Sequence, residues 1–198
     1  MIELTDKVKK RFDMQLKKLW VGQSQMKNAR PVLNQVHYTG NGHIEITNSH
    51  VGVRLSDVHN KPDSDEKFPM LDNIFRLPDK VAAVEFDMET LRQLENQANV
   101  LFKYKLDVIK LTMNKEGITL TSKPLNSMNF VECGLKMELP IDDEVSIGLN
   151  PRYLHDALNM FRMIGAENAT LYYESAVRPI HLVYENLHYL IVPIRTNK

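Results

Sequence analysis

The stretch SIGLNPRYLHDALNMFRMIGAENATLYYESAVRPIHLVYENLHYLIVPIR, residues 146–195, carries the clearest structural pattern in this sequence of 198 residues. Asn150 can cap a helix, and Pro151 stands at a first helical position, where proline is tolerated. Apolar residues then recur at helical spacing until Gly165, which predicts one amphipathic helix: Tyr153, Leu154, Ala157, Leu158 and Phe161. Three alternating segments follow, ATLYYES, PIHLVYE and YLIVPI, and each predicts a strand.

The same order of elements occurs twice earlier in the chain. AAVEF predicts a strand, and Asp87 is a plausible cap for a helix with one apolar face. Three further segments after this helix predict strands: DVIKLTM, GITLTS and FVECGLKMEL. Near the start, Val8, Phe12, Leu16 and Leu19 share one helical face before VLNQVHY, HIEITNS and VGVRLS alternate. We therefore predict three strand-helix-three-strand units, at 1–66, 77–140 and 141–198, with NKPDSDEKFPM as a linker.

Units of this kind predict an α+β fold with helices on one face of antiparallel sheets. A helix stripe and one sheet face need an apolar cover, so two units side by side can share a core. Three units leave the first one without a partner. Because soluble monomers avoid exposing apolar surface on that scale, we expect a homo-oligomer. A final strand containing Pro193 is expected at a sheet edge, since proline donates no ladder hydrogen bond.

Composition indicates a soluble protein of the cytoplasm. Lysine and arginine together equal aspartate and glutamate in number, so overall charge gives no signal for nucleic acid. The single Cys133 excludes an internal disulfide and fits a reducing compartment. The first residues lack the apolar core of a signal peptide, and no run is long enough to span a membrane.

Charge is concentrated at the amino terminus, where residues 1–30 hold eight lysines or arginines against three acidic residues. If Val8 points to the core, five cations project from the opposite side of the first helix: Lys7, Lys10, Arg11, Lys17 and Lys18. Such a stripe suits neutralisation of phosphates without reading of bases. An ordinary solvated helix face explains it equally well.

Signs of catalysis are missing from the sequence. The seven histidines show no metal-ligand spacing, and the eight glycines form no phosphate-binding loop. DSDE at 63–66 is better explained as a solvated acidic linker than as a metal site. We therefore predict no catalytic residue, no metal and no cofactor.

Three segments resemble one family in its own order along the chain. SIGLNPRYLHDALNMF followed by YLIVPIR resembles the closing half of the last domain of the bacterial sliding clamp, the DNA polymerase III beta subunit. RPVLNQVHY with IEITNSHVGVRLS is similar to the strand pair of the clamp's middle domain, and EKFPMLDNIFRLPDK resembles the connection to the next domain. The resemblance implies a DNA-clamp-like fold, with 1–76 as a half domain plus connection and 77–198 as a complete domain. Asn48 and Val51 depart from the family's usual aspartate and arginine.

The resemblance also implies a function. A clamp is a non-enzymatic processivity factor that holds duplex DNA without sequence preference, and its helices line the ring, which adds Arg92, Arg152 and Arg162 as DNA contacts. A clamp also docks DNA polymerases and repair proteins through a groove for a short peptide. The matching positions here are Leu33, Thr47, Ser49, His50, Val51, Pro69, Ile74, Asn150, Tyr153, Val177, Val192, Pro193, Ile194 and Arg195. Two alternatives stay open: an interaction module that binds such peptides without encircling DNA, and an enzyme of unknown type.

Overall fold

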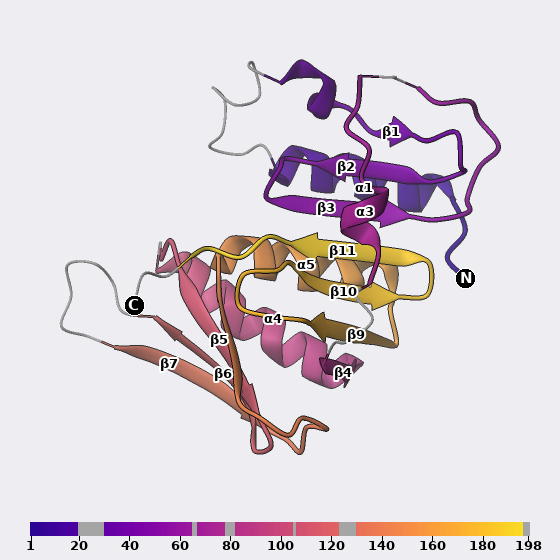
Figure 1. Ribbon diagram of the computed structural model, residues 1–198. Coiled ribbons are helices and arrows are strands. Elements are labelled where there is room, and N and C mark those ends of the chain that lie inside the picture. The colour runs from indigo at the N-terminus through magenta and orange to yellow at the C-terminus, as the bar shows by residue number, and fades with distance from the viewer. Residues whose placement is uncertain (20–29, 65–66, 78–81, 105, 123–129, 196–198) are drawn as a thin grey trace. The chain divides into compact units, whose positions relative to one another are not determined.

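The computed structural model of the chain describes all residues except 20–29, 65–66, 78–81, 105, 123–129 and 196–198 (Figure 1). The fold is mixed α+β with antiparallel sheets. The chain divides into two compact units. Unit 1 comprises Met1–Leu77 together with Val183–Leu190, and unit 2 comprises Pro78–Leu182 together with Ile191–Lys198. The boundary therefore passes through the last hairpin of the chain.

Unit 1 is a small antiparallel sheet with a helix on each face (Figure 1). Its elements are α1 (Asp6–Leu19), a 3₁₀ turn (Pro31–Asn34), β1 (His37–Tyr38), β2 (Ile44–Thr47), β3 (Val51–Leu55), α3 (Asp72–Phe75) and most of β11 (Leu187–Ile191). The strand order is β1-β2-β3-β11. Helix α1 contacts β2, whereas Phe75 of α3 packs against Gly52 of β3, where a Cβ atom would lie 3.0 Å from the Phe75 ring. Every residue of β2 and β3 is therefore buried.

Unit 2 packs a pair of helices against strands of two sheets. Its elements are β4 (Ala82–Asp87), α4 (Met88–Lys103), β5 (Ile109–Asn114), β6 (Gly117–Ser122), β7 (Val131–Lys136), β8 (Val145–Leu149), α5 (Pro151–Ile164), β9 (Asn168–Tyr173) and the first part of β10 (Ile180–Tyr184). One sheet has the order β7-β6-β5-β8, and in the other β9 lies between β10 and β4. Leu94 of α4 and Leu158 of α5 meet Leu111 and Leu171 from the two sheets in one apolar core. None of the helices described has the length and apolar character needed to cross a bilayer.

The predicted helix ends of unit 2 are confirmed. The Asp87 side chain accepts a hydrogen bond from the Thr90 N–H at 2.8 Å, and Asn150 accepts one from the Arg152 N–H at 2.9 Å. Gly165 ends α5 in the left-handed conformation, with φ of 78°, which glycine adopts at little cost. Local capping chemistry was therefore sufficient to predict where these helices begin and where α5 ends.

Two expectations about the strands of the first predicted unit were wrong. Residues 1–5 form no strand, so this unit lacks the leading strand of the other two. VLNQVHY forms a 3₁₀ turn and only the two-residue strand β1. Pro31 sits at the start of that turn, where its fixed φ favours helical geometry, and Leu33 donates its N–H to the Arg30 carbonyl at 3.1 Å.

The expected edge strand with Pro193 was also wrong. β11 ends at Ile191 and lies between β3 and β10, so it is an interior strand. Pro193 has no N–H for a ladder and falls beyond the strand. The tail instead runs to β8, where the Ile194 N–H donates to the Gly148 carbonyl at 2.8 Å.

The helix stripe of α1, expected to be uncovered, is largely covered within unit 1. Phe12 and Leu19 are buried, and between them the Gln15 amide donates to the Tyr189 hydroxyl at 2.7 Å. Val8 and Leu16, predicted as core residues, are only half-buried. Part of this cover comes from β2, and Tyr189 in the remote segment 183–190 adds the partner of Gln15, which the local pattern could not reveal.

The buried His181 on β10 predicts that unit 2 is sensitive to acid. Burial lowers the pKa of His181 from 6.5 to about 4, so between these values the unfolded chain binds a proton that the folded chain excludes. Stability is therefore full above about pH 6.5 and falls as the pH drops toward about 4, by about 3 kcal/mol from this group. In urea denaturation at pH 7 and pH 4.5, His181→Gln should lose less stability on acidification than the unchanged protein. His50→Gln, at an exposed position, is the control, and an equal acid loss in all three proteins would contradict the assignment.

Candidate functional site

The basic stripe predicted on the first helix lies on α1, away from its buried face. Phe12, Gln15 and Leu19 define the buried direction. Three of the five predicted cations are exposed and two are half-buried on the flanks: Lys7, Lys10 and Lys17 are exposed, and Arg11 and Lys18 are half-buried. At 100° per residue, Lys10 and Lys17 point almost opposite to the buried face. The exposed lysines are therefore the members of the stripe best placed to meet a polyanion.

The three arginines predicted on the other helices each have a carboxylate neighbour. Arg92 lies 3.8 Å from Glu89, and Arg152 lies 3.6 Å from Asp156. Arg162 binds Glu95 through both Nε, at 2.6 Å, and a terminal nitrogen, at 3.3 Å. These pairs compensate charge within unit 2, so the three arginines offer less free positive charge than their number indicates.

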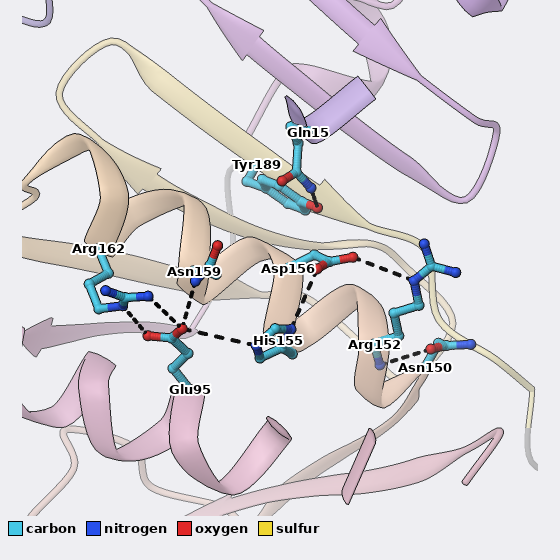
Figure 2. Close-up of polar contacts among 9 residues, drawn as sticks. All are labelled: Gln15, Glu95, Asn150, Arg152, His155, Asp156, Asn159, Arg162 and Tyr189. Atoms are coloured by element: carbon cyan, nitrogen blue, oxygen red, sulfur yellow. Dashed lines mark hydrogen bonds and ion pairs between the residues drawn. The ribbon is translucent and has the colours of Figure 1, made fainter. Parts of the chain in front are cut away.

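Glu95 is the centre of a polar cluster between α4 and α5 (Figure 2). Its carboxylate accepts from Arg162 and, at 2.8 Å, from the Asn159 amide, and the His155 Nε2 lies 4.0 Å away. Burial alone would raise the pKa of Glu95, but the hydrogen bonds from Arg162 and Asn159 and the neighbouring positive charge outweigh it and lower the pKa. His155 Nδ1 in turn lies 3.4 Å from Asp156. This arrangement joins two helices through an ionised carboxylate and holds no nucleophile.

A second buried ion pair organises unit 1. Glu45 and Arg54 face each other across β2 and β3, with Arg54 Nε donating to Glu45 at 2.6 Å. Arg54 also donates to Asp72 of α3 at 2.7 Å and lies 4.5 Å above the Phe75 ring. Burial raises the pKa of Glu45, although the charge of Arg54 opposes that shift. The pair therefore attaches the short connection helix α3 to the sheet.

Unit 1 places the groove residues assigned to it partly in the core and partly in solvent. Leu33, Thr47 and Val51 are buried, with the Thr47 hydroxyl donating to the Val51 carbonyl at 2.6 Å. The exposed members are Ser49, His50, Pro69 and Ile74. Ser49 has a φ of 73° and forms the tip of the β2–β3 hairpin. Only the exposed side chains of this set are accessible to a peptide.

The groove residues assigned to unit 2 are likewise partly buried and partly exposed. Asn150 caps α5, and Tyr153 is only 8% exposed. Val177 is 63% exposed, the tail residues Val192, Pro193 and Ile194 are half-buried, and Arg195 is exposed. The predicted groove draws on both units, so its existence as one surface stays a prediction.

Sequence reasoning missed the polar residues that organise both units. Glu45, Glu95 and Gln15 are each nearly inaccessible to solvent. Alternation placed Glu45 on a solvent face of its strand, and amphipathic spacing treated only apolar residues as core. Glu95 stands beside Leu94 within the buried stripe of α4, and this was the one available signal.

No metal site is formed within the described part of the chain, since it contains no group of three histidine, cysteine or acidic residues suited to an ion. The polar clusters of the two units are ion pairs and hydrogen bonds between structural elements. The arrangement can therefore offer a charged helix face and exposed apolar side chains for binding.

Comparisons with known proteins identify the fold. Residues 77–195 match the family model described as DNA polymerase III beta subunit, C-terminal domain. No curated protein sequence matches the chain. Solved structures with a similar fold include the DNA polymerase sliding clamp of Pseudomonas aeruginosa, at 12% identity and a TM-score of 0.66 over 93% of this chain and 64% of that one.

Two more clamp structures have a similar fold. The DNA polymerase III beta chain of Streptococcus pneumoniae has 18% identity and a TM-score of 0.67, with 96% of this chain and 63% of that one covered. The beta subunit of Thermotoga maritima has 14% identity and a TM-score of 0.68, with 94% and 64% covered. The chain thus spans less than two thirds of the length of these solved clamp chains.

The departure at Asn48 generates a prediction for unit 1. Asn48 is fully buried, and its Oδ1 accepts from the N–H groups of His50 and Val51 at 3.0 and 2.9 Å, whereas its Nδ2 donates to the Leu19 carbonyl at 2.9 Å. An aspartate would keep the two acceptor contacts but place a carboxylate oxygen against the carbonyl that ends α1.

We expect Asn48→Asp to lower the free energy of unfolding by about 2–4 kcal/mol, because a buried donor is lost and a buried charge is introduced. Urea denaturation followed by circular dichroism measures the change. Asn41→Asp makes the same substitution at an exposed position of unit 1 and should be nearly neutral. Equal midpoints for the two variants would show that the Asn48 amide donor is dispensable.

Proposed function

This chain belongs to the DNA polymerase III beta subunit family, and we propose that it is a non-enzymatic clamp that associates with duplex DNA without sequence preference and docks replication or repair proteins. The family match over residues 77–195 carries this proposal. In the proposed domain organisation, residues 1–76 are a clamp half domain with its connection and residues 77–198 a complete clamp domain. In this proposal the chain surrounds DNA as an assembly of copies.

DNA contact is proposed to come mainly from α1. Its exposed lysines project away from the buried face, and the ion pair described on this helix joins Lys9 to Asp6, neither of which belongs to the predicted stripe. Phosphate neutralisation needs cations that are free to approach the duplex. Arg92, Arg152 and Arg162 remain secondary candidates, since each would first have to share or release a carboxylate.

Peptide docking is proposed to use the exposed groove residues. Ile74 is 42% exposed and Val177 is 63% exposed, so both side chains are accessible to a peptide. Burying one Leu-sized anchor contributes about 1.5–3 kcal/mol, so two or three anchors, less the cost of ordering a flexible peptide, give an affinity on the order of micromolar.

A second candidate function is an interaction module that binds such peptides without encircling DNA. The pairing of Arg92, Arg152 and Arg162 with carboxylates favours it, because these helices then supply little free positive charge. The two functions differ in one measurable property, which is binding to duplex DNA.

The DNA proposal predicts weak, sequence-indifferent binding with a strong salt dependence. Replacing Lys7, Lys10 and Lys17 with Gln should weaken binding to two duplexes of unrelated sequence alike and reduce the slope of log affinity against log salt by about 2–3. Fluorescence anisotropy over a salt series measures both quantities.

The control for this triple variant replaces three exposed lysines elsewhere, Lys61, Lys110 and Lys115, and should retain most of the binding. Equal losses in both triple variants would mean that α1 has no special role. Absence of DNA binding by the unchanged protein would favour the interaction module.

The peptide proposal predicts binding of a consensus clamp-binding peptide with Gln and apolar anchors. Val177→Glu should abolish this binding without unfolding the protein, because the Val177 side chain lies mostly in solvent. Val100→Glu makes the same change on α4 at a 49% exposed position and should leave peptide affinity unchanged. Isothermal titration distinguishes the two, and a peptide that binds neither variant nor the unchanged protein would overturn the docking role.

A further inference from the structure

Residues 57–64, called the strap below, follow β3 and lie beside the β1–β2 hairpin of unit 1 (Figure 1). The Val58 N–H donates to the Gly42 carbonyl at 2.9 Å. Gly42 has a φ of 85°, and a Cβ atom there would lie 2.9 Å from the His59 carbonyl, so only glycine lets the strap approach this closely. Val58 and His59 are half-buried, whereas 60–64 are exposed. The strap is therefore held mainly by hydrogen bonds, as is typical of segments that open locally.

Two histidines hold the first half of the strap through their ring nitrogens. The Nδ1 atom of His43, on the hairpin, accepts from the Asp57 N–H at 3.4 Å. The His59 Nε2 lies 2.8 Å from the His43 carbonyl, and the His59 Nδ1 accepts from the Lys61 N–H at 3.0 Å. A carbonyl can only accept, so the proton of His59 is on Nε2 and its Nδ1 carries none. These contacts require both imidazoles to be neutral, because a protonated imidazole has no acceptor nitrogen.

The surroundings of His43 favour its neutral form. Burial, with the charge of Arg54 next, lowers the pKa of His43. Asp57 and Asp72 act in the opposite direction without reversing the shift, and His59 adds to the lowering. The folded chain therefore resists the proton that would break the contact between His43 and the Asp57 N–H.

His59 shares its aromatic neighbour with a cation. The rings of His59 and Tyr38 lie 5.1 Å apart and are steeply inclined to each other, and the Lys61 ammonium lies 4.3 Å from the centroid of the same Tyr38 ring. A proton on His59 would add a second positive charge to the surroundings of that ring, besides removing the acceptor for the Lys61 N–H.

The far end of the strap is attached at a third histidine, which tolerates a proton. The His37 Nε2 lies 3.4 Å from the Asp63 carboxylate, and its Nδ1 lies 3.1 Å from the Ser64 hydroxyl. The ring is buried and stacked on Phe68, with centroids 4.1 Å apart. A hydroxyl both donates and accepts, so a second ring proton leaves the Ser64 contact possible and makes the Asp63 contact an ion pair. The Ser64 N–H also donates to the Tyr38 carbonyl at 2.9 Å, so this end does not depend on a neutral histidine.

We propose that the first half of the strap, residues 57–61, is released by acid: protons on His43 and His59 remove the two Nδ1 acceptors that hold it, while Ser64 stays attached. Histidine changes its charge between about pH 5 and 8, and in an open segment it titrates near pH 6.5. The contacts are fully present above that pH and are lost as the pH falls, because the open segment binds protons that the closed one excludes. Opening then becomes about tenfold more favourable per histidine for each pH unit below about 6.5.

Release of this half loosens the chain that leads from β3 toward α3 and leaves the sheet folded. The sheet of unit 1 is buried, and α3 keeps its own contact through Arg54 and Asp72. The device requires no DNA, no peptide and no second copy, so it stands or falls independently of the proposed clamp function.

The test is amide hydrogen exchange of the full chain, measured by NMR at pH 7.5 and pH 5.5 and corrected for the intrinsic effect of pH on exchange. Protection at the Asp57, Val58 and Lys61 amides should fall by about tenfold for each of the two histidines, whereas the amides of β3 should keep theirs. The double variant H43N/H59N keeps a neutral side-chain acceptor near each Nδ1 position, since an asparagine oxygen accepts from nearby N–H groups. Its protection should change by less than about twofold between the two pH values.

His50→Asn is the matched control, because His50 is exposed at the β2–β3 turn, and it should lose protection in the strap like the unchanged protein. An equal acid loss in H43N/H59N would reject the role of the two histidines. Unchanged protection in the unchanged protein at pH 5.5, or loss in β3 to the same extent, would reject a local release. The imidazole resonances of His43 and His59 give a readout that needs no variant: their protonation and the loss of protection should follow one pH curve, and protonated rings with an intact strap would overturn the proposal.

Discussion

Unit 1 depends on a segment supplied from the far end of the chain. Residues 183–190 add β11 beside β3 and bring Tyr189 to the buried Gln15 amide of α1. At the tip of the hairpin, the Asn186 side chain accepts from the Ile2 N–H at 2.9 Å and donates to the Ser56 carbonyl at 2.7 Å. A buried amide or a strand edge without such partners would cost free energy, so these contacts are conditions for unit 1 to be stable.

This dependence changes how the first predicted unit is understood. Of the three predicted strand-helix-three-strand units, the first has no partner unit and would need another molecule to cover its helix. In the folded chain, much of that cover is intramolecular, and Phe12 and Leu19 are buried without a second copy. The burial of these two residues removes an uncovered α1 as the reason for assembly.

Each unit uses a buried ion pair to join two of its structural elements. In unit 2, Glu95 of α4 accepts hydrogen bonds from Arg162 and Asn159 of α5. The positive charge of Arg162 is therefore paired within the contact between the two helices. In unit 1, Arg54 is paired in the same way with Glu45 and Asp72. Breaking either arrangement by removing one partner would leave a buried charge uncompensated. The exposed Lys7, Lys10 and Lys17 of α1 have no comparable structural role among the described contacts.

The sequence by itself determined the α+β fold, the helix caps at Asp87 and Asn150, the end of α5 at Gly165, and most strand positions from Ile44 onward. These features depend on capping, turn geometry and alternation, which act over a few residues. Tertiary structure alone decided that β11 is an interior strand, that Gln15, Glu45 and Glu95 are buried, and that Arg162 is a packing residue. Each of those outcomes depends on a partner more than eight residues away in sequence, such as Tyr189 for Gln15, and a local pattern carries no information about which distant group will satisfy a buried polar atom.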